Sequence, residues 1–307
     1  MERKSIYLCM LAFLLSCSDS VKVSRTLDEM PVIIPDYNGV VVPPNIAPLN
    51  FALNNQSAAS RAVFSFEGQQ FEVKGEKGGF VIPPSKWKKM LESAAGKSIQ
   101  VTIQMKQDNE WVAYSPFVIR IAPEKVDSYL VYRLIDPGYE LWNKMGIYQR
   151  DLESYTQTPI IENKMSGNNC VNCHSFCMQN PDKMLFHMRE TFPGTIFVDG
   201  DKIEKLNTKT KETISSLVYP SWHPSGKYVA FSVNVTKQAF HLNDKNRVEV
   251  YDEASDVVVY DVEKHEIVTA SNIFSKDAFE TFPTFSPDGK TLYFCTAEAR
   301  PMPQEYS

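Results

Sequence analysis

The residues of this sequence best suited to chemistry lie in the run Cys170-Val171-Asn172-Cys173-His174. A Cys-x-x-Cys-His run is the attachment signature of c-type haem. Its two thiols bond to the two vinyl groups of one porphyrin, and the adjacent imidazole binds the iron from one side, as proximal haem histidines do. The run therefore predicts covalent haem c held by Cys170 and Cys173, with His174 as the proximal iron ligand.

Cys177 follows this run closely and keeps other interpretations open. Three cysteines with His174 or His187 match the donor set of a structural zinc site, in which Cys177 would be a ligand. Cys170 and Cys173 are also compatible with a disulfide or a redox dithiol. The spacing of the three cysteines resembles part of an iron–sulfur ligand set, but a fourth cysteine is not nearby.

A haem iron also has a second axial position, for which His187 and His223 are the candidate ligands. His187 is expected on the strand that follows the turn at Pro181. His223 is expected in the next repeat described below, in the entry loop equivalent to that of the haem motif. The competing interpretation for each is a buried structural histidine, because most histidines are not ligands.

The N-terminus predicts the compartment. Arg3 and Lys4 precede a short apolar segment at 6–15, and Leu14-Leu15-Ser16-Cys17 resembles a bacterial lipobox. Residues 1–17 are therefore expected to be a lipoprotein signal, cleaved before a lipid-modified Cys17 that anchors the chain to a membrane; an ordinary secretory signal is the alternative. The expected location is the bacterial cell envelope, facing the periplasm or the cell surface, outside the cytoplasm, where haem c is also attached.

Composition limits the remaining possibilities. The chain has 307 residues, of which 43% are hydrophobic and 12% aromatic, and it has 19 prolines, which together favour two domains rich in β structure. The net charge of −5 excludes the basic footprint of a nucleic-acid-binding protein. Polar residues 18–34 are expected to form a tether.

Residues 35–125 are predicted to form a β-sandwich-like domain. The expected strands are 61–66, 70–73, 79–82, 99–105 and 111–121, with turns at Glu67-Gly68 and Asp108-Asn109. One helix is expected at Pro84–Ala94, capped by Ser85.

The segment 140–307 contains an internal repeat. Turns of similar sequence begin at Pro181, Pro224 and Pro287, and the last two are preceded by Pro220-Ser221-Trp222 and Pro283-Thr284-Phe285. The first interval fits a four-stranded propeller blade of about 40–45 residues. The interval from Pro224 to Pro287 is longer, and the polar segment 236–254 is the expected insertion. Strand–turn–strand pairs at 146–161, 194–203 and 256–268 fit the outer halves of the blades.

These repeats resemble the TolB-type β-propeller family, because Phe285-Ser286-Pro287-Asp288-Gly289-Lys290 fits its recurrent turn closely and 222–227 departs from it at two positions. The fold class implied is all-β, a sandwich-like domain followed by a partial, truncated propeller. The haem motif would occupy the entry loop of a blade. No nucleophile elbow, phosphate loop or His-Glu-x-x-His motif occurs, so no catalytic residue is assigned.

The resulting functional hypothesis is a lipid-anchored propeller that uses haem c for electron transfer or redox sensing, with an unidentified redox or protein partner. One alternative is a haem-free module that binds a protein or glycan and has a zinc ion or disulfide at the cysteines. A second alternative is the propeller part of a hydrolase whose catalytic domain lies elsewhere, which depends on analogy alone.

Overall fold

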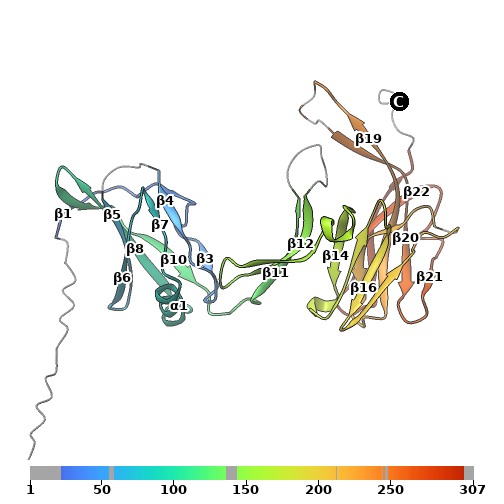
Figure 1. Ribbon diagram of the computed structural model, residues 1–307, viewed down its shortest axis with the longest axis horizontal. Coiled ribbons are helices and arrows are strands. Elements are labelled where there is room, and N and C mark those ends of the chain that lie inside the picture. The colour runs from blue at the N-terminus through green and yellow to red at the C-terminus, as the bar shows by residue number, and fades with distance from the viewer. Residues whose placement is uncertain are drawn as a thin grey trace, which may run out of the picture. The chain divides into compact units, whose positions relative to one another are not determined.

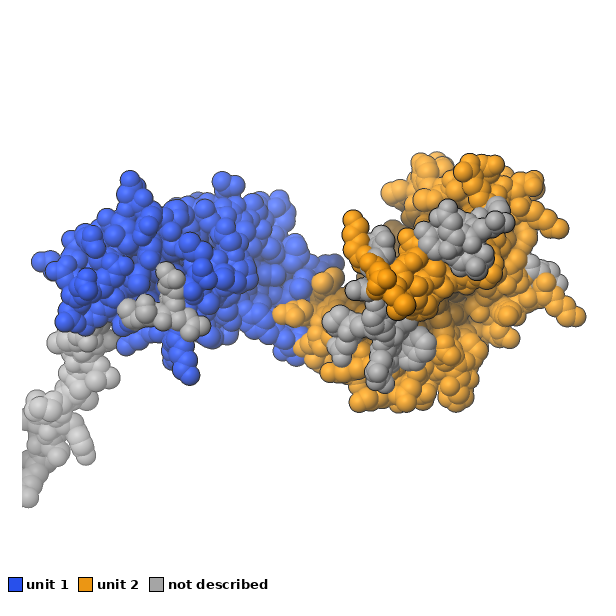
Figure 2. Space-filling view, turned by 90° about the horizontal axis from the view of Figure 1, so that it is seen from above, with its two compact units in different colours: residues 1–128, 151–156 blue, residues 129–150, 157–307 orange. Residues whose placement is uncertain are grey.

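The computed structural model describes residues 22–54, 59–135, 144–211, 213–243, 245 and 248–300. They form two compact units, shown in separate colours in Figure 2. Unit 1 contains residues up to Ser128 and Asp151–Thr156, and unit 2 contains Tyr129–Arg150 and the chain from Gln157 onward. Cys17, the expected lipid anchor, lies outside the described residues.

Unit 1 has two sheets and one helix around a shared core. Its strands are β1 (Val23–Thr26), β2 (Ile33–Ile34), β3 (Val41–Val42), β4 (Phe51–Leu53), β5 (Ser60–Phe66), β6 (Gln69–Lys74), β7 (Gly79–Phe80), β8 (Ser98–Gln107), β9 (Glu110–Ala113) and β10 (Phe117–Ile121). The larger sheet has the order β1-β9-β8-β10-β3, with β5 paired to β8 and β6 to β5, and the smaller has the order β2-β4-β7. Buried residues of both sheets belong to one hydrophobic cluster, which confirms the sandwich-like architecture.

Local sequence explains much of unit 1. The φ angles of Glu67 and Gly68 are 43° and 81°, and those of Asp108 and Asn109 are 47° and 65°. Two central residues with positive φ suit the tight hairpin turns that join right-twisted strands. Both turns lie where the sequence predicts them. By contrast, β1 lies within the expected tether at 18–34 and pairs with β9.

Helix α1 (Pro84–Ser93) also lies where it was expected, but its predicted cap is wrong. The N-cap residue is Pro83, no side chain caps the helix, and Pro84 occupies the first turn. Proline is favoured there because its missing N–H would have no partner within the helix in any case. The helix buries Trp87, Met90 and Leu91, which share one face at helical spacing. Among the residues that the structure describes, no helix has the length and apolar character needed to cross a membrane.

Unit 2 is a series of antiparallel sheets whose strands follow chain order. Its elements are β11 (Tyr129–Ile135), β12 (Met145–Asp151), β13 (Gln157–Glu162), η1 (Asn163–Ser166), β14 (Val171–Phe176), η2 (Cys177–Gln179), β15 (Lys183–Met188), β16 (Gly194–Asp199), β17 (Lys202–Leu206), β18 (Leu217–Trp222), β19 (Tyr228–Phe240), β20 (Val248–Asp261), β21 (Glu266–Val268), β22 (Ala278–Phe285) and β23 (Leu292–Glu298). The sheets are β11-β12-β13, β14-β15-β16-β17, β18-β19-β20-β21 and β22-β23. Four-stranded antiparallel units in chain order are the blades of a propeller-like fold, as the repeat predicts.

Successive sheets of unit 2 pack against each other through their faces, and Figure 1 shows the chain passing through them from green to red. Met184 and Phe186 of β15 pack in one core with Ile147 of β12. Leu185, between them, packs in a second core with Phe231 of the following sheet. Because neighbouring strand residues point to opposite faces, one strand serves both cores.

The expected insertion at 236–254 extends β19 and β20 beyond their sheet as a hairpin arm (Figure 1). A register shift between Val235 and Thr236 marks where the arm begins. The description of this insertion as polar is incomplete, because Phe240 is 64% exposed and Leu242 is 87% exposed.

Candidate functional site

Residues 171–174 of the haem motif lie on β14, the first strand of the second sheet of unit 2, and Cys170 directly precedes this strand. Val171 and Asn172 pair with Met188 and His187 of β15. The expectation that the motif forms a blade entry loop is therefore wrong, because its backbone is part of a hydrogen-bonded ladder. A motif on a strand is held by its neighbouring strand, whereas a loop has only its ends fixed.

A β-bulge interrupts β14 within the motif. The register shifts between Asn172 and Ser175, and the φ angle of Cys173 is 52°. In a regular strand, residues three positions apart point to opposite faces. One extra residue on the bulged strand changes this phase, so Cys170 and Cys173 are no longer required to point apart. The side chain of Asn172 stabilises the bulge, because its Oδ1 accepts a hydrogen bond of 2.8 Å from the Cys173 N–H.

The same bulge recurs in the first strands of the next two sheets. Tyr219 in β18 has a φ angle of 51° and Phe282 in β22 has one of 53°, and both lie within register shifts. Cys173 therefore occupies the position that aromatic residues hold in the other two sheets, and His174 occupies the position of a proline. Sequence reasoning placed the motif at the position of 219–223 in the next repeat but did not predict the bulge, because a bulge is defined by the pairing of two strands.

The two motif thiols are free and half-buried. Burial is the main cause that raises the pKa of Cys170, and the charge of Cys173 raises it further. The positive charges of Arg189 and Arg133 oppose this effect. The two thiols are thus close enough to interact electrostatically, beside two guanidinium groups.

His174 is in the state that metal binding requires. Burial chiefly lowers the pKa of His174, a hydrogen bond with the backbone of Val131 raises it, and the charge of Arg133 lowers it. The ring is therefore neutral near pH 7, with one nitrogen donating to a backbone carbonyl. Metal-binding histidines are commonly oriented by such a bond, which leaves the other nitrogen free to bind the metal.

Two exposed aromatic side chains lie on the bulges beside the motif. The ring centroids of Tyr219 and Phe282 are 4.8 Å apart in an edge-to-face arrangement. Burial raises the pKa of Tyr219, and the charge of Cys173 raises it further, which places the phenol within electrostatic range of that thiol. Tyr219 is 44% exposed and Phe282 is 53% exposed, so the pair can contact a ligand.

The two candidates for a second axial ligand have partners outside this group. His187 is 3% exposed, and its Nδ1 lies 3.3 Å from the hydroxyl of Thr195. The Nδ1 of His223 lies 2.8 Å from Ser225 Oγ, and its Nε2 lies 3.0 Å from the carbonyl oxygen of Gly289. A second axial ligand therefore stays a prediction from the sequence.

Cys177 lies apart from the other motif cysteines. It is buried in the core that contains Leu185 and Trp222, whereas Cys170 packs against the core on the other side of the sheet. Within the described ranges, no group of three or more His, Cys, Asp or Glu side chains is arranged to hold a metal ion. The alternative zinc site with Cys177 as a ligand therefore needs a rearrangement of these side chains.

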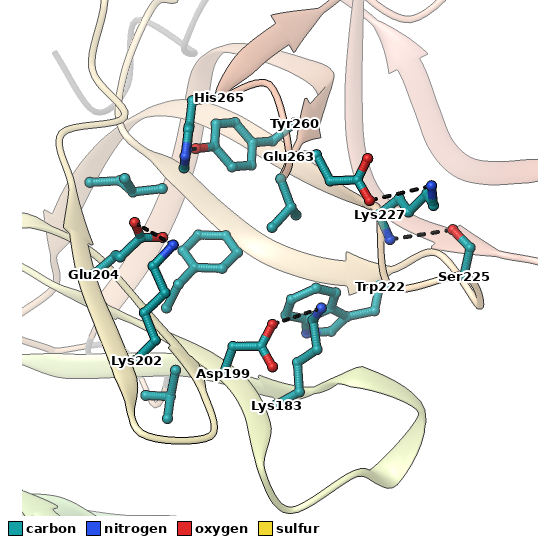
Figure 3. Close-up of a pocket in the computed structure, with 15 residues that line it drawn as sticks. Lys183, Asp199, Lys202, Glu204, Trp222, Ser225, Lys227, Tyr260, Glu263 and His265 are labelled. Carbon is teal, nitrogen blue, oxygen red and sulfur yellow. Dashed lines mark hydrogen bonds and ion pairs between the residues drawn. The ribbon is translucent and has the colours of Figure 1, made fainter.

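A pocket of about 350 Å³ lies between the second and third sheets of unit 2 (Figure 3). Its floor contains the buried aromatic rings of Phe197, Trp222 and Tyr260. Its rim consists of three ion pairs, Lys183–Asp199 at 3.1 Å, Lys202–Glu204 at 2.9 Å and Lys227–Glu263 at 3.3 Å. Each lysine among the described residues of the rim has a carboxylate partner, so these lysines offer an ionic ligand no unpaired charge.

Tyr260 and His265 form a polar pair at the edge of this pocket (Figure 3). The hydroxyl oxygen of Tyr260 lies 2.7 Å from His265 Nδ1. Burial raises the pKa of Tyr260 to about 12, so its hydroxyl stays protonated at neutral pH and shares this hydrogen bond with the imidazole. The pair is not part of any motif, and sequence reasoning did not identify the pocket.

Comparisons with known proteins identify no family for this chain. No family model and no curated protein matches it. Dipeptidyl peptidase 4 of Porphyromonas gingivalis is a distant structural neighbour, with 14% identity and a TM-score of 0.35 over 57% of this chain and 29% of that one. An oligogalacturonate lyase, solved in complex with manganese, has 13% identity and a TM-score of 0.27 over 54% of this chain and 58% of that one. The chain spans less than two thirds of either neighbour, and the likeness concerns the fold alone.

Proposed function

We propose that this chain is a lipid-anchored protein of the bacterial cell envelope that binds haem c through Cys170 and Cys173 and transfers electrons or senses redox state. The observation that carries the proposal is the state of the motif. Both thiols are free and interact electrostatically, and the adjacent His174 is neutral and oriented by the backbone of Val131. These are the residues and states that covalent haem attachment and iron ligation need.

The surroundings of the motif fit the two ends of a haem. Its propionates are anionic, and Arg133 and Arg189 supply positive charge beside Cys170. Arg133 is also held in place, because its Nη1 donates a hydrogen bond of 2.7 Å to Asn172 Oδ1. The porphyrin is flat and apolar, and the exposed rings of Tyr219 and Phe282 suit contact with such a surface. When bound, haem supplies one-electron chemistry that no side chain of the motif provides.

The anchor and the compartment follow from the lipobox-like segment that ends at Cys17. A lipid on Cys17 would keep the mature chain at a membrane, while the motif faces the space outside the cytoplasm. Haem attachment to a Cys-x-x-Cys-His run also takes place outside the cytoplasm. The two features therefore support one another.

Intact-mass analysis tests the proposal. The full chain is produced in a bacterial host that attaches haem, purified from membranes and compared with Cys170→Ser, Cys173→Ser and Cys177→Ser. We expect one covalently bound haem on the wild-type chain and on Cys177→Ser. On Cys170→Ser and Cys173→Ser we expect no haem bound through two thioether bonds. The same spectra show whether Cys17 bears a lipid. Cys177→Ser is the matched control, because it removes a nearby thiol outside the motif.

An unmodified wild-type mass in a host that loads other haem c proteins contradicts the haem proposal. One zinc ion per chain in that sample would instead favour the haem-free interaction module. A cleaved but unlipidated N-terminus would contradict the anchor and leave the haem result standing.

A further inference from the structure

Two buried carboxylates lie between the third and fourth sheets of unit 2, away from the haem motif. Asp256 on β20 and Glu280 on β22 are each 4% exposed. Ser275 joins them, because its N–H donates to Asp256 Oδ1 at 3.0 Å and its hydroxyl donates to Glu280 Oε1 at 2.7 Å. Two carboxylates on different strands thus contact a single serine inside the protein.

Among the residues that the structure describes, one oxygen of this group has no partner. Glu280 Oε2 is buried without a hydrogen bond, and the amide oxygen of Asn234 is in the same condition. Asn234 belongs to the adjoining polar network, since its Nδ2 lies 3.1 Å from Ser255 Oγ, which donates to the Glu280 carbonyl oxygen at 2.6 Å. Buried polar atoms are nearly always satisfied in folded proteins, so an orphaned carboxylate oxygen points to a missing partner.

The two carboxylates lie in an environment that favours a positively charged partner. Burial chiefly raises the pKa of Asp256, and the negative charge of Glu280 raises it further, whereas the Ser275 N–H lowers it. None of the ion pairs found among the described residues involves either carboxylate. Burying ionised carboxylates without a cation is costly, and proteins resolve this by protonating a carboxyl, by ion pairing or by metal coordination.

The donor set selects the cation. The two carboxylates and the serine hydroxyl that joins them are hard oxygen donors, the type of ligand that Ca²⁺ binds, whereas Zn²⁺ prefers nitrogen and sulfur ligands. Mg²⁺ usually keeps several of its waters, whereas Ca²⁺ accepts irregular sets of protein oxygens. We propose that Asp256 and Glu280 bind a calcium ion that links β20 to β22.

Such an ion would stabilise the contact between the third and fourth sheets. Ser255 and Ser232 already connect these sheets, through the Glu280 carbonyl and the Phe282 N–H respectively. The ion adds a bond between side chains that are otherwise mutually repulsive. Because a bound ligand stabilises only the folded state, calcium should raise the melting temperature of unit 2.

The test uses the full chain, stripped of metal with a chelator and then dialysed against buffer with or without CaCl₂ at about 1 mM, a concentration at which weak extracellular calcium sites fill. We expect one calcium per chain by elemental analysis and a rise in melting temperature of about 5 °C. Glu280→Gln should lose both effects. Glu253→Gln should retain them, because Glu253 lies on β20, the strand of Asp256, but pairs with Lys237 at 2.6 Å.

Several results would overturn the proposal. One is a wild-type chain that binds no calcium and whose melting temperature does not change when calcium is added. This measurement does not depend on the folding of any variant. Another is an equal shift with MgCl₂ or in Glu280→Gln, which would show an effect unrelated to this site. If Glu280→Gln is instead more stable at neutral pH and calcium has no effect, the two carboxylates share a proton.

Discussion

Acidification should destabilise unit 2 through His187. This side chain is 3% exposed on β15, and burial, aided by the charge of Arg189, lowers its pKa from 6.5 to about 4. In the unfolded chain the imidazole regains its ordinary pKa. The unfolded state therefore binds a proton at a higher pH than the folded state does. Wherever this difference exists, the free energy of unfolding decreases as the pH is lowered.

The size of the effect follows from the two pKa values. Above pH 6.5 both states are neutral and His187 adds no pH dependence; as the pH falls from 6.5 toward 4 the unfolded state alone gains the proton. Each pKa unit corresponds to about 1.4 kcal/mol, so the loss reaches about 3 kcal/mol below pH 4 and about 2.5 kcal/mol at about pH 4.5.

Urea unfolding of wild type and His187→Gln at about pH 7 and pH 4.5 measures this term. Other groups titrate alike in both chains, so the difference between the two pH-dependent losses isolates His187. We expect wild type to lose about 2.5 kcal/mol more than His187→Gln. Equal losses in wild type and His187→Gln would refute the reasoning, because the buried ring would then not be the group that takes up the proton.

Two further predictions concern packing within unit 2, both measured by urea unfolding. Trp222→Phe removes the indole N–H that donates to the Ser175 carbonyl oxygen at 3.2 Å. The free energy of unfolding should fall by about 1–3 kcal/mol, because that carbonyl loses its partner. Trp111→Phe, in unit 1, is the control, and an equal loss there would contradict the role of this bond. Gly194→Ala places a methyl group 2.8 Å from a β17 carbonyl oxygen at a φ angle of +152°, and should cost at least about 2 kcal/mol. Gly200→Ala meets no atom within 4 Å at a φ angle of +60° and should cost less, about 1 kcal/mol; the reverse order would contradict the steric argument.

The sequence alone was sufficient for the features set by short-range chemistry. Alternating apolar residues predict the strands, and the pairs Glu67-Gly68 and Asp108-Asn109 predict hairpin turns whose residues have positive φ. The repeated turns at Pro224 and Pro287 predict successive sheets of similar topology. The Cys-x-x-Cys-His run can be read directly, because covalent attachment depends on residues that are neighbours in the chain.

Tertiary structure decided everything that depends on residues distant in sequence. Only the register between β14 and β15 reveals the bulge at Cys173, because a bulge is defined by two strands. The different states of His174 and His187 depend on which side chains and backbone groups bury them. The Asp256–Glu280 pair has no motif, since its members come together only when β22 packs on β20. Burial, pKa and buried charge arise from packing, and local propensity contains no information about them.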